Sequence, residues 1–174
     1  MICNAGTILK RITHFFVLIA LLLAPVLADA RITQFIITST QSPTFEGISL
    51  GAVGGYEKLI GRVTGEVDPN DPRNEVIVDV KLAPKNARGM VEYATDFLIL
   101  RPIDASKSNR RLIYDVTNRG RISGFPIFNS SSAENNPTTA ADAGNGYLMR
   151  QGYTIVLSGW DFSAAGGDGS FSTT

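Results

Sequence analysis

Two stretches in the first half of the chain alternate between apolar and polar residues, and this pattern constrains the fold more than any other feature. Residues 59–67 read LIGRVTGEV and residues 75–82 read EVIVDVKL, so in each stretch every second residue is apolar or a glycine. An alternation with a period of two is typical of half-buried β-strands. Residues 68–74 between them, DPNDPRN, are dense in turn formers. The sequence therefore predicts an antiparallel hairpin closed by a long loop.

Further strands are expected on either side of this hairpin. Residues 31–40 and 93–101 are rich in β-branched and aromatic residues, which favour strands. Residues 41–56 contain Pro43 and four glycines and are expected to form a loop. The first part of the chain, residues 31–101, is therefore predicted to be β-rich.

The second part of the chain changes character. Residues 112–117 (LIYDVT) and 153–158 (YTIVLS) are short, largely apolar strands, whereas residues 119–136 are irregular and rich in glycine, serine and asparagine. A helix is expected over residues 139–151. A strand, a helix and a strand in this order form a βαβ unit with parallel strands. We therefore expect an α/β fold, in which the β-rich region leads into a βαβ unit over residues 112–158.

The expected helix has recognisable ends. Thr139 and Asp142 have the spacing of a capping box, and Gly152 is a suitable C-terminal stop. Gly144 and Gly146 lie inside the helix and weaken it by about 1 kcal/mol each relative to alanine.

The N-terminus has the layout of a secretory signal peptide. The basic residues 10–11 precede residues 15–27, FFVLIALLLAPVL, which carry no charge. Ala28 and Ala30 then supply the small side chains of a cleavage site, which places Arg31 at the start of the mature chain. The apolar run is shorter than the roughly 20 residues of a membrane-spanning helix. We expect residues 1–30 to be removed, with an uncleaved anchor as the alternative, and the mature protein to be secreted or periplasmic without a stable membrane anchor.

Composition excludes several classes of function. The 16 basic and 16 acidic residues balance, so there is no electrostatic case for a nucleic-acid partner. The single histidine, His14, and the single cysteine, Cys3, both lie in the expected leader. A mature chain without imidazole or thiol cannot form a Ser-His-Asp triad, a Cys-His dyad, a Cys/His zinc site, an iron–sulfur cluster or a disulfide. We expect neither a metal nor a cofactor.

The last residues contain no element that would close the fold. Residues 162–174, FSAAGGDGSFSTT, are rich in glycine and serine and are expected to form a flexible, truncated end. A sheet built around one βαβ unit leaves an exposed edge. We therefore interpret the chain as the N-terminal part of a larger protein. A complete small domain with a disordered tail is the alternative.

One short segment has the position of a functional loop. Residues 115–120, DVTNRG, begin inside an expected strand and continue into a loop. In α/β-hydrolases the loop after the third strand supplies a backbone N–H to the oxyanion hole, and glycine allows the close approach that such a donor needs. The alternative is a plain turn at the end of a strand, in which Arg119 pairs with a carboxylate. The nucleophile motif Gly-x-Ser-x-Gly is absent.

Longer blocks of the sequence resemble a family of secreted proteins known as alpha/beta hydrolase domain-containing. The resemblance covers roughly residues 31–165 and is carried by residues 56–59 (YEKL), 65–69 (GEVDP), 82–89 (LAPKNARG), 91–93 (VEY), 114–120 (YDVTNRG), 136–147 (NPTTAADAGNGY) and 148–154 (LMRQGYT). It implies an N-terminal β-region followed by the first strands of an α/β-hydrolase sheet. The family's serine, acid and histidine would then lie beyond Thr174, so no catalytic residue can be assigned within this chain. Asn118, Arg119 and Gly120 match the family by position only, as a candidate oxyanion loop.

Two classes of function follow from these observations. The first is the N-terminal part of an exported hydrolase that acts on small-molecule carboxylic esters or related acyl substrates, and in this case the chain alone is predicted to be inactive. The second is a non-catalytic exported binding module with the same fold. The sequence does not decide the oligomeric state.

Overall fold

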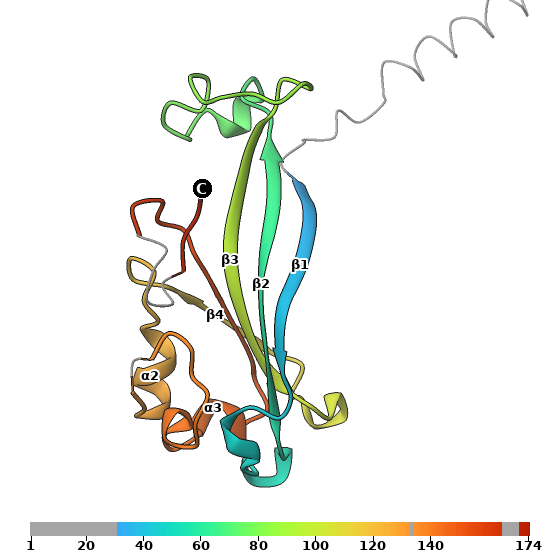
Figure 1. The fold of residues 1–174 in the computed structure, drawn as a ribbon, viewed down its shortest axis with the longest axis vertical. Coiled ribbons are helices and arrows are strands. Elements are labelled where there is room, and N and C mark those ends of the chain that lie inside the picture. The colour runs from blue at the N-terminus through green and yellow to red at the C-terminus, as the bar shows by residue number, and fades with distance from the viewer. Residues whose placement is uncertain (1–30, 133, 165–170) are drawn as a thin grey trace, which may run out of the picture.

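The computed structural model describes residues 31–132, 134–164 and 171–174, and the predicted leader with its cleavage site lies outside these residues. The described residues form one five-stranded sheet in the order β1-β2-β3-β5-β4 (Figure 1). The strands are β1 (Arg31–Gln41), β2 (Tyr56–Val67), β3 (Val91–Pro102), β4 (Leu112–Val116) and β5 (Thr154–Ser158).

The sheet is mixed. Strands β1, β2 and β3 are antiparallel neighbours, and β3 also pairs antiparallel with β5. Strands β4 and β5 are parallel and in register from the pair Leu112–Thr154 to the pair Val116–Ser158. The β-rich first part and the parallel strand pair in the second part are therefore confirmed. Because most strand pairs are antiparallel and the helices are short, the described residues have an α+β architecture.

The predicted partner of β2 is wrong. Strand β2 pairs with β3 along its whole length, from Tyr56 opposite Pro102 to Val67 opposite Val91. Residues 75–82 form successive turns within the connection between these strands, and Asp79 has a φ of 58°, which an extended strand does not allow. The alternation in this segment suits a strand, but the longer β3 offers β2 twelve paired residues and occupies the place beside it.

The predicted long helix over residues 139–151 is also wrong. This segment contains a single 3₁₀ turn, Ala141–Ala143, and one turn of α-helix, α3 (Tyr147–Arg150). Gly144 breaks the helix with φ 56° and ψ −133°, and a Cβ there would lie 2.2 Å from the carbonyl oxygen of Asn129. The other α-helix of the described residues, α2 (Gly124–Asn129), lies in the stretch that was expected to be irregular. The remaining 3₁₀ turns are Phe45–Gly47, Gly51–Val53, Pro72–Asn74 and Ala105–Lys107.

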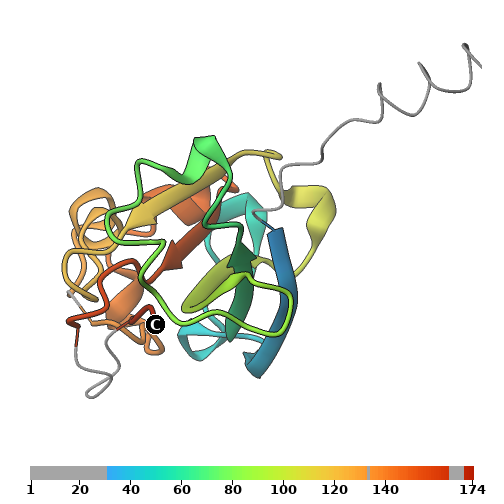
Figure 2. The ribbon, with the colours of Figure 1, turned by 90° about the horizontal axis from the view of Figure 1, so that it is seen from above.

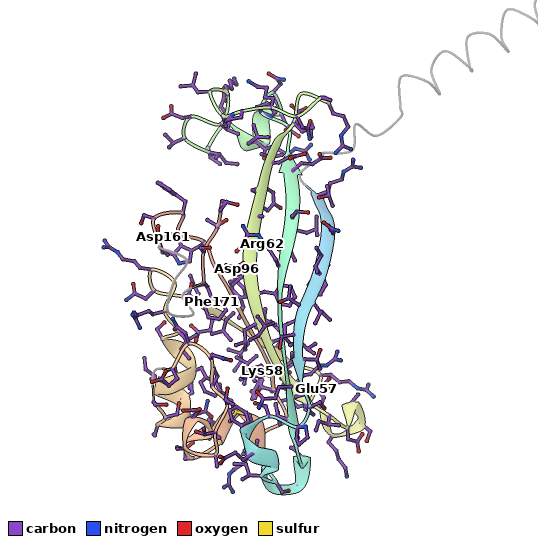
Figure 3. All side chains as sticks on the ribbon, viewed as in Figure 1. Glu57, Lys58, Arg62, Asp96, Asp161 and Phe171 are labelled. Carbon is purple, nitrogen blue, oxygen red and sulfur yellow. The ribbon has the colours of Figure 1, made fainter. Side chains whose placement is uncertain are left out.

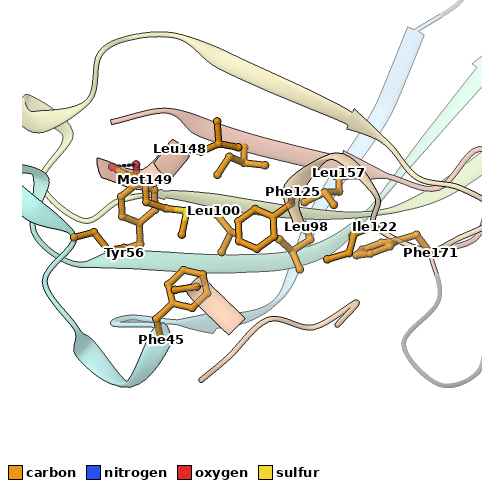
Figure 4. Close-up of a cluster of buried hydrophobic side chains, with 13 residues drawn as sticks. Phe45, Tyr56, Leu98, Leu100, Ile122, Phe125, Leu148, Met149, Leu157 and Phe171 are labelled. Atoms are coloured by element: carbon orange, nitrogen blue, oxygen red, sulfur yellow. Dashed lines mark hydrogen bonds between the residues drawn. The ribbon is translucent and has the colours of Figure 1, made fainter. Parts of the chain in front are cut away.

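The core lies between the sheet and the helical segments. Seen from above, α2, α3 and their connections lie on the side of the sheet away from β1 (Figure 2). Side chains from these segments, from the connection between β1 and β2, and from β2, β3 and β5 form one buried cluster, which includes Phe45, Leu98, Leu100, Phe125, Leu148, Met149, Ile155 and Leu157 (Figure 4). The hydroxyl of Tyr56 donates to the carbonyl oxygens of Met149 and Tyr153 at 3.0 and 2.9 Å, and burial raises the pKa of this hydroxyl. This bond joins the start of β2 to α3.

Residues 171–174 extend the sheet beyond the end of β5. Thr173 forms an antiparallel bridge with Thr95 of β3, and Ala94 and Thr174 exchange two backbone hydrogen bonds of 2.8 Å. Phe171 is buried in the core cluster beside Ile122 (Figure 4). These four residues therefore differ from the flexible end that was expected over residues 162–174.

Two glycines of β2 lie opposite aromatic residues of β3. Gly61 pairs with Phe97, and Gly65 pairs with Tyr93. The ring of Phe97 also stacks on Phe35 of β1, with 4.5 Å between the ring centroids. A Cβ at Gly61 would lie 2.0 Å from a backbone oxygen of β1, whereas a Cβ at Gly65 would lie 2.3 Å from the end of the Tyr93 side chain. An aromatic ring lying across a glycine on the neighbouring strand is a known way to fix the register of a sheet.

These contacts predict different effects for two matched substitutions. Gly61→Ala must displace the backbone of β1 and should lower the free energy of unfolding by more than about 3 kcal/mol. Gly65→Ala requires only that the Tyr93 ring moves, and should cost about 1–2 kcal/mol. Urea denaturation of both variants measures the difference. An equal loss of unfolding free energy in the two variants would show that the contact between Gly61 and the backbone of β1 does not make substitution there more costly.

Candidate functional site

The candidate oxyanion loop forms a tight turn directly after β4. Asn118 and Arg121 exchange backbone hydrogen bonds of 2.6 and 3.0 Å, and the residues between them, Arg119 and Gly120, have φ values of 50° and 80°. Positive φ at both central positions is typical of a type I′ turn, and glycine adopts it without strain. Within the described part of the chain, the N–H groups of Arg119 and Gly120 have no hydrogen-bond acceptor. The turn therefore has two consecutive backbone donors, one at the exposed Arg119 and one at the buried Gly120.

The start of the turn is fixed to the end of β5. The hydroxyl of Thr117 donates to the carbonyl oxygen of Ser158 at 3.0 Å. The indole N–H of Trp160 in turn donates to the carbonyl oxygen of Thr117. The chain that leaves β4 is thus held against the chain that leaves β5, at the carboxyl end of both strands.

A buried asparagine holds the other side of the turn. The amide nitrogen of Asn135 donates to the carbonyl oxygen of Gly120 at 3.2 Å, and its amide oxygen accepts from the N–H of Ile122 at 3.0 Å. The N–H of Phe171 donates to the same Gly120 carbonyl at 3.0 Å. Because Gly120 and Ile122 are both buried, these bonds favour one conformation of the turn.

The strand before the turn supplies a cap for α2. The carboxylate of Asp115 is buried and accepts from the N–H of Phe125 at 2.8 Å and from the hydroxyl of Ser123 at 3.4 Å. A Cβ at Gly124 would lie 3.1 Å from this carboxyl group, so a small residue lets the strand and the helix approach. Asn135 therefore positions the turn, and Asp115 positions the start of the helix that follows it. Sequence reasoning missed both roles because these bonds leave no local pattern.

The alternative interpretation of the turn, an ion pair of Arg119, is matched in the described residues only by a weak charge interaction with Asp161. The pKa of the Asp161 carboxyl lies below its ordinary value because it accepts hydrogen bonds from Ser163, and the positive charge of Arg119 contributes a smaller part. No ion pair within 4.0 Å involves Arg119 in the residues that the structure covers.

A second polar cluster lies at the opposite end of the sheet, around Lys58 of β2 (Figure 3). This side chain is 4% exposed. Its ammonium group donates to the amide oxygen of Asn136 at 2.6 Å, to the carbonyl oxygen of Pro137 at 2.9 Å and to the hydroxyl of Thr138 at 2.7 Å. Burial lowers the pKa of Lys58, and the negative charge of Asp142 opposes this shift. Since all three ammonium hydrogens have acceptors, the cluster is a structural clamp on the loop.

The predicted capping box forms, although it opens only a 3₁₀ turn. The carboxylate of Asp142 accepts from the N–H of Thr139 at 2.7 Å, and the N–H of Asp142 lies 3.4 Å from the hydroxyl of Thr139. The same carboxylate also accepts from the N–H of Thr138 and the hydroxyl of Ser132. Partial burial opposes ionisation of Asp142, but these hydrogen bonds outweigh it and lower its pKa.

Other classes of site are not found in the described residues. They contain no group of three or more histidine, cysteine, aspartate or glutamate side chains that could hold a metal ion. None of their helices has the length and apolarity needed to cross a membrane.

Comparisons with known proteins do not extend this description. No family model, curated protein or solved structure matches the chain.

The hydrogen bonds of Asp142 predict an acid-dependent stability. The folded pKa lies below the ordinary value of 3.8, so the carboxylate stabilises the fold above about pH 4, and this contribution is lost as the pH falls through the folded pKa. Asp142→Asn should lower the free energy of unfolding at pH 7 by about 1 kcal/mol, since hydrogen bonds to a charged group are stronger than those to a neutral one. It should also flatten the loss of stability below pH 4. Thermal melts from pH 2 to pH 7 test this, and a variant that keeps the acid dependence of the parent would contradict it.

Proposed function

We propose that this chain forms the first part of an exported hydrolase of the α/β type, which acts on carboxylic esters or related acyl substrates. The serine nucleophile, its acid and its histidine would lie outside these 174 residues. The observation that carries the proposal is the turn after β4, which has two consecutive backbone N–H groups without an acceptor in the described residues, at the carboxyl end of a parallel strand pair.

The sheet supports this proposal through its strand order. Antiparallel strands come first in the chain, and the parallel pair of β4 and β5 follows at one edge. Strand β4 pairs with β5 on one side only in the described sheet, and its side chains Leu112, Tyr114 and Val116 are exposed. Parallel strands are normally covered on both faces and continued by further strands. Strand β4 therefore suits an interior position, with the nucleophile strand beside it.

The turn has the features that an oxyanion site requires. Stabilising a developing oxyanion needs donors that are already in place, because reorganisation during the reaction would cost energy. Thr117, Asn135 and Asp115 hold the turn and its neighbours from three directions. In an α/β-hydrolase the loop at this point of the topology contributes one such donor.

A non-catalytic binding module is the second candidate. The observation that favours it is the N–H of Phe171, which donates to the carbonyl of Gly120 while the Phe171 ring packs in the core. A turn covered in this way serves as a structural support, and no substrate would need to reach it.

Export belongs to the same proposal. The leader over residues 1–30 would be cleaved after Ala30, and the mature chain would begin at Arg31. N-terminal sequencing of the exported protein tests this, and an intact Met1 on exported material would contradict it.

The activity test compares this chain with the product of its complete reading frame on a p-nitrophenyl ester. We expect hydrolysis by the complete product only, because residues 31–174 contain no histidine to act as a base for a serine. Asn135→Asp in the complete product places a carboxylate oxygen against the carbonyl of Gly120 and should lower turnover roughly 10²–10³-fold if the turn holds the oxyanion donors.

Arg119→Gly is the matched control, since it removes the side chain, keeps the backbone N–H and suits the positive φ. Its turnover should stay near that of the parent. Gly120→Pro is unsuitable, because proline cannot adopt a φ of 80°. Unchanged turnover in a well-folded Asn135→Asp variant would remove the turn from the site, and hydrolysis by the 174-residue chain alone would overturn the assignment of the catalytic residues.

A further inference from the structure

The connection between β2 and β3, residues 68–90, lies at the far end of this hairpin (Figure 1). Side chains of the connection and of the adjoining strand ends line an apolar groove there. Its volume is about 740 Å³, which is within the range of small-molecule sites. The lining residues are almost all aliphatic, and they are Val67, Ile77, Val78, Asp79, Val80, Leu82, Ala83, Val91 and Tyr93.

The groove is built on fixed elements. Val67 and Val91 are the last pair of the β2–β3 register, and the ring of Tyr93 lies across Gly65. The buried carboxylate of Glu66 on β2 accepts from Arg88, which ties the connection to the sheet, and from Arg31, which ties β1 to β2. The groove is therefore preformed.

The residues around the groove expose an unusual amount of apolar surface. Val78 and Leu82 are 86% and 81% exposed, and Ile77 beside them is 44% exposed. Clustered aliphatic side chains on a protein surface are a cost that a ligand or partner normally offsets.

We propose that this groove binds the hydrocarbon chain of an amphiphile, such as a fatty acyl chain. A bound polypeptide would bring backbone N–H and C=O groups that need hydrogen-bond partners. Among the described lining residues only the Asp79 carboxylate and the Tyr93 hydroxyl are polar side-chain groups, so the side chains of the groove give a peptide backbone few hydrogen-bond partners. A hydrocarbon chain needs no such partners, and its burial contributes about 0.8 kcal/mol per methylene group.

The groove lies at the same end of the sheet as the turn after β4. Ser158, at the end of β5, lies opposite Phe97, and β3 continues beyond this point to Tyr93 and Val91. A second hollow of about 660 Å³ shares Ile77, Ala83, Val91 and Tyr93 with the groove and also contacts Phe162 and Thr174. The groove thus lies beyond the carboxyl ends of β4 and β5, the same end as the turn after β4. Chain binding does not depend on the proposed hydrolase function, but it would make long-chain acyl esters the substrate class of that site.

The test is a fluorescence titration of the purified chain with cis-parinaric acid, which becomes brighter when its hydrocarbon chain leaves water. We expect saturable binding to the parent. Val78→Asp places a charge in the lining and should weaken binding at least tenfold. Val76→Asp is the matched control, because Val76 is 85% exposed on the same connection but does not line the groove. Since both valines are almost fully exposed, neither variant should change the melting temperature.

The proposal is overturned if the parent does not bind the probe saturably, or if the Val78→Asp and Val76→Asp variants bind it equally well. The methyl ester of the probe should bind as tightly as the acid, because the hydrocarbon chain carries the recognition. Binding of the acid alone would show that a charged group is recognised. The titration involves no turnover, so its result is separate from that of the esterase test.

Discussion

The long antiparallel pairing of β2 with β3 is the constraint on which the rest of the structure depends. Its register runs without interruption from Tyr56 to Val67, and the aromatic rings lying across Gly61 and Gly65 fix it. One end of this hairpin carries Tyr56, whose hydroxyl bonds α3, and Lys58, which clamps the loop around residues 136–138. The other end extends beyond β5 and carries the apolar groove. The hairpin therefore sets the distance between the core and the groove.

Buried polar side chains do the positioning that longer helices would do in a larger domain. Asp115 caps α2 from within β4, and Asn135 bonds both sides of the turn after that strand. In the described residues no buried side-chain nitrogen or oxygen lacks a hydrogen-bond partner, so the burial of these groups favours one arrangement of the loops instead of destabilising the fold. This explains how segments with only one or two helical turns hold a defined shape.

Strand positions could be predicted from the sequence, but strand partners and helix lengths could not. The alternation over residues 59–67 identified β2, and the apolar runs identified the parallel pair of β4 and β5. Residues 75–82 carry the same alternation and still form turns. A local pattern does not determine which segment of the chain pairs with β2. The prediction of a helix over residues 139–151 was wrong because Gly144 lies against the backbone of Asn129, a contact between residues that are distant in the sequence. The turn after β4 could be located from its glycine, which is a local signal. The hydrogen bonds of Asn135 that hold the turn could not be predicted, because they join residues that are distant in the sequence.

Hydrogen–deuterium exchange of strand β4 tests most directly the proposal that β4 is an interior strand of a larger sheet. In the 174-residue chain, the amides of β4 should exchange faster than those of β5, which is paired on both sides. In the product of the complete reading frame, the amides of β4 should become as protected as those of β5. Equal protection of β4 in the two proteins would contradict the account, because it would mean that no further strand pairs with this edge.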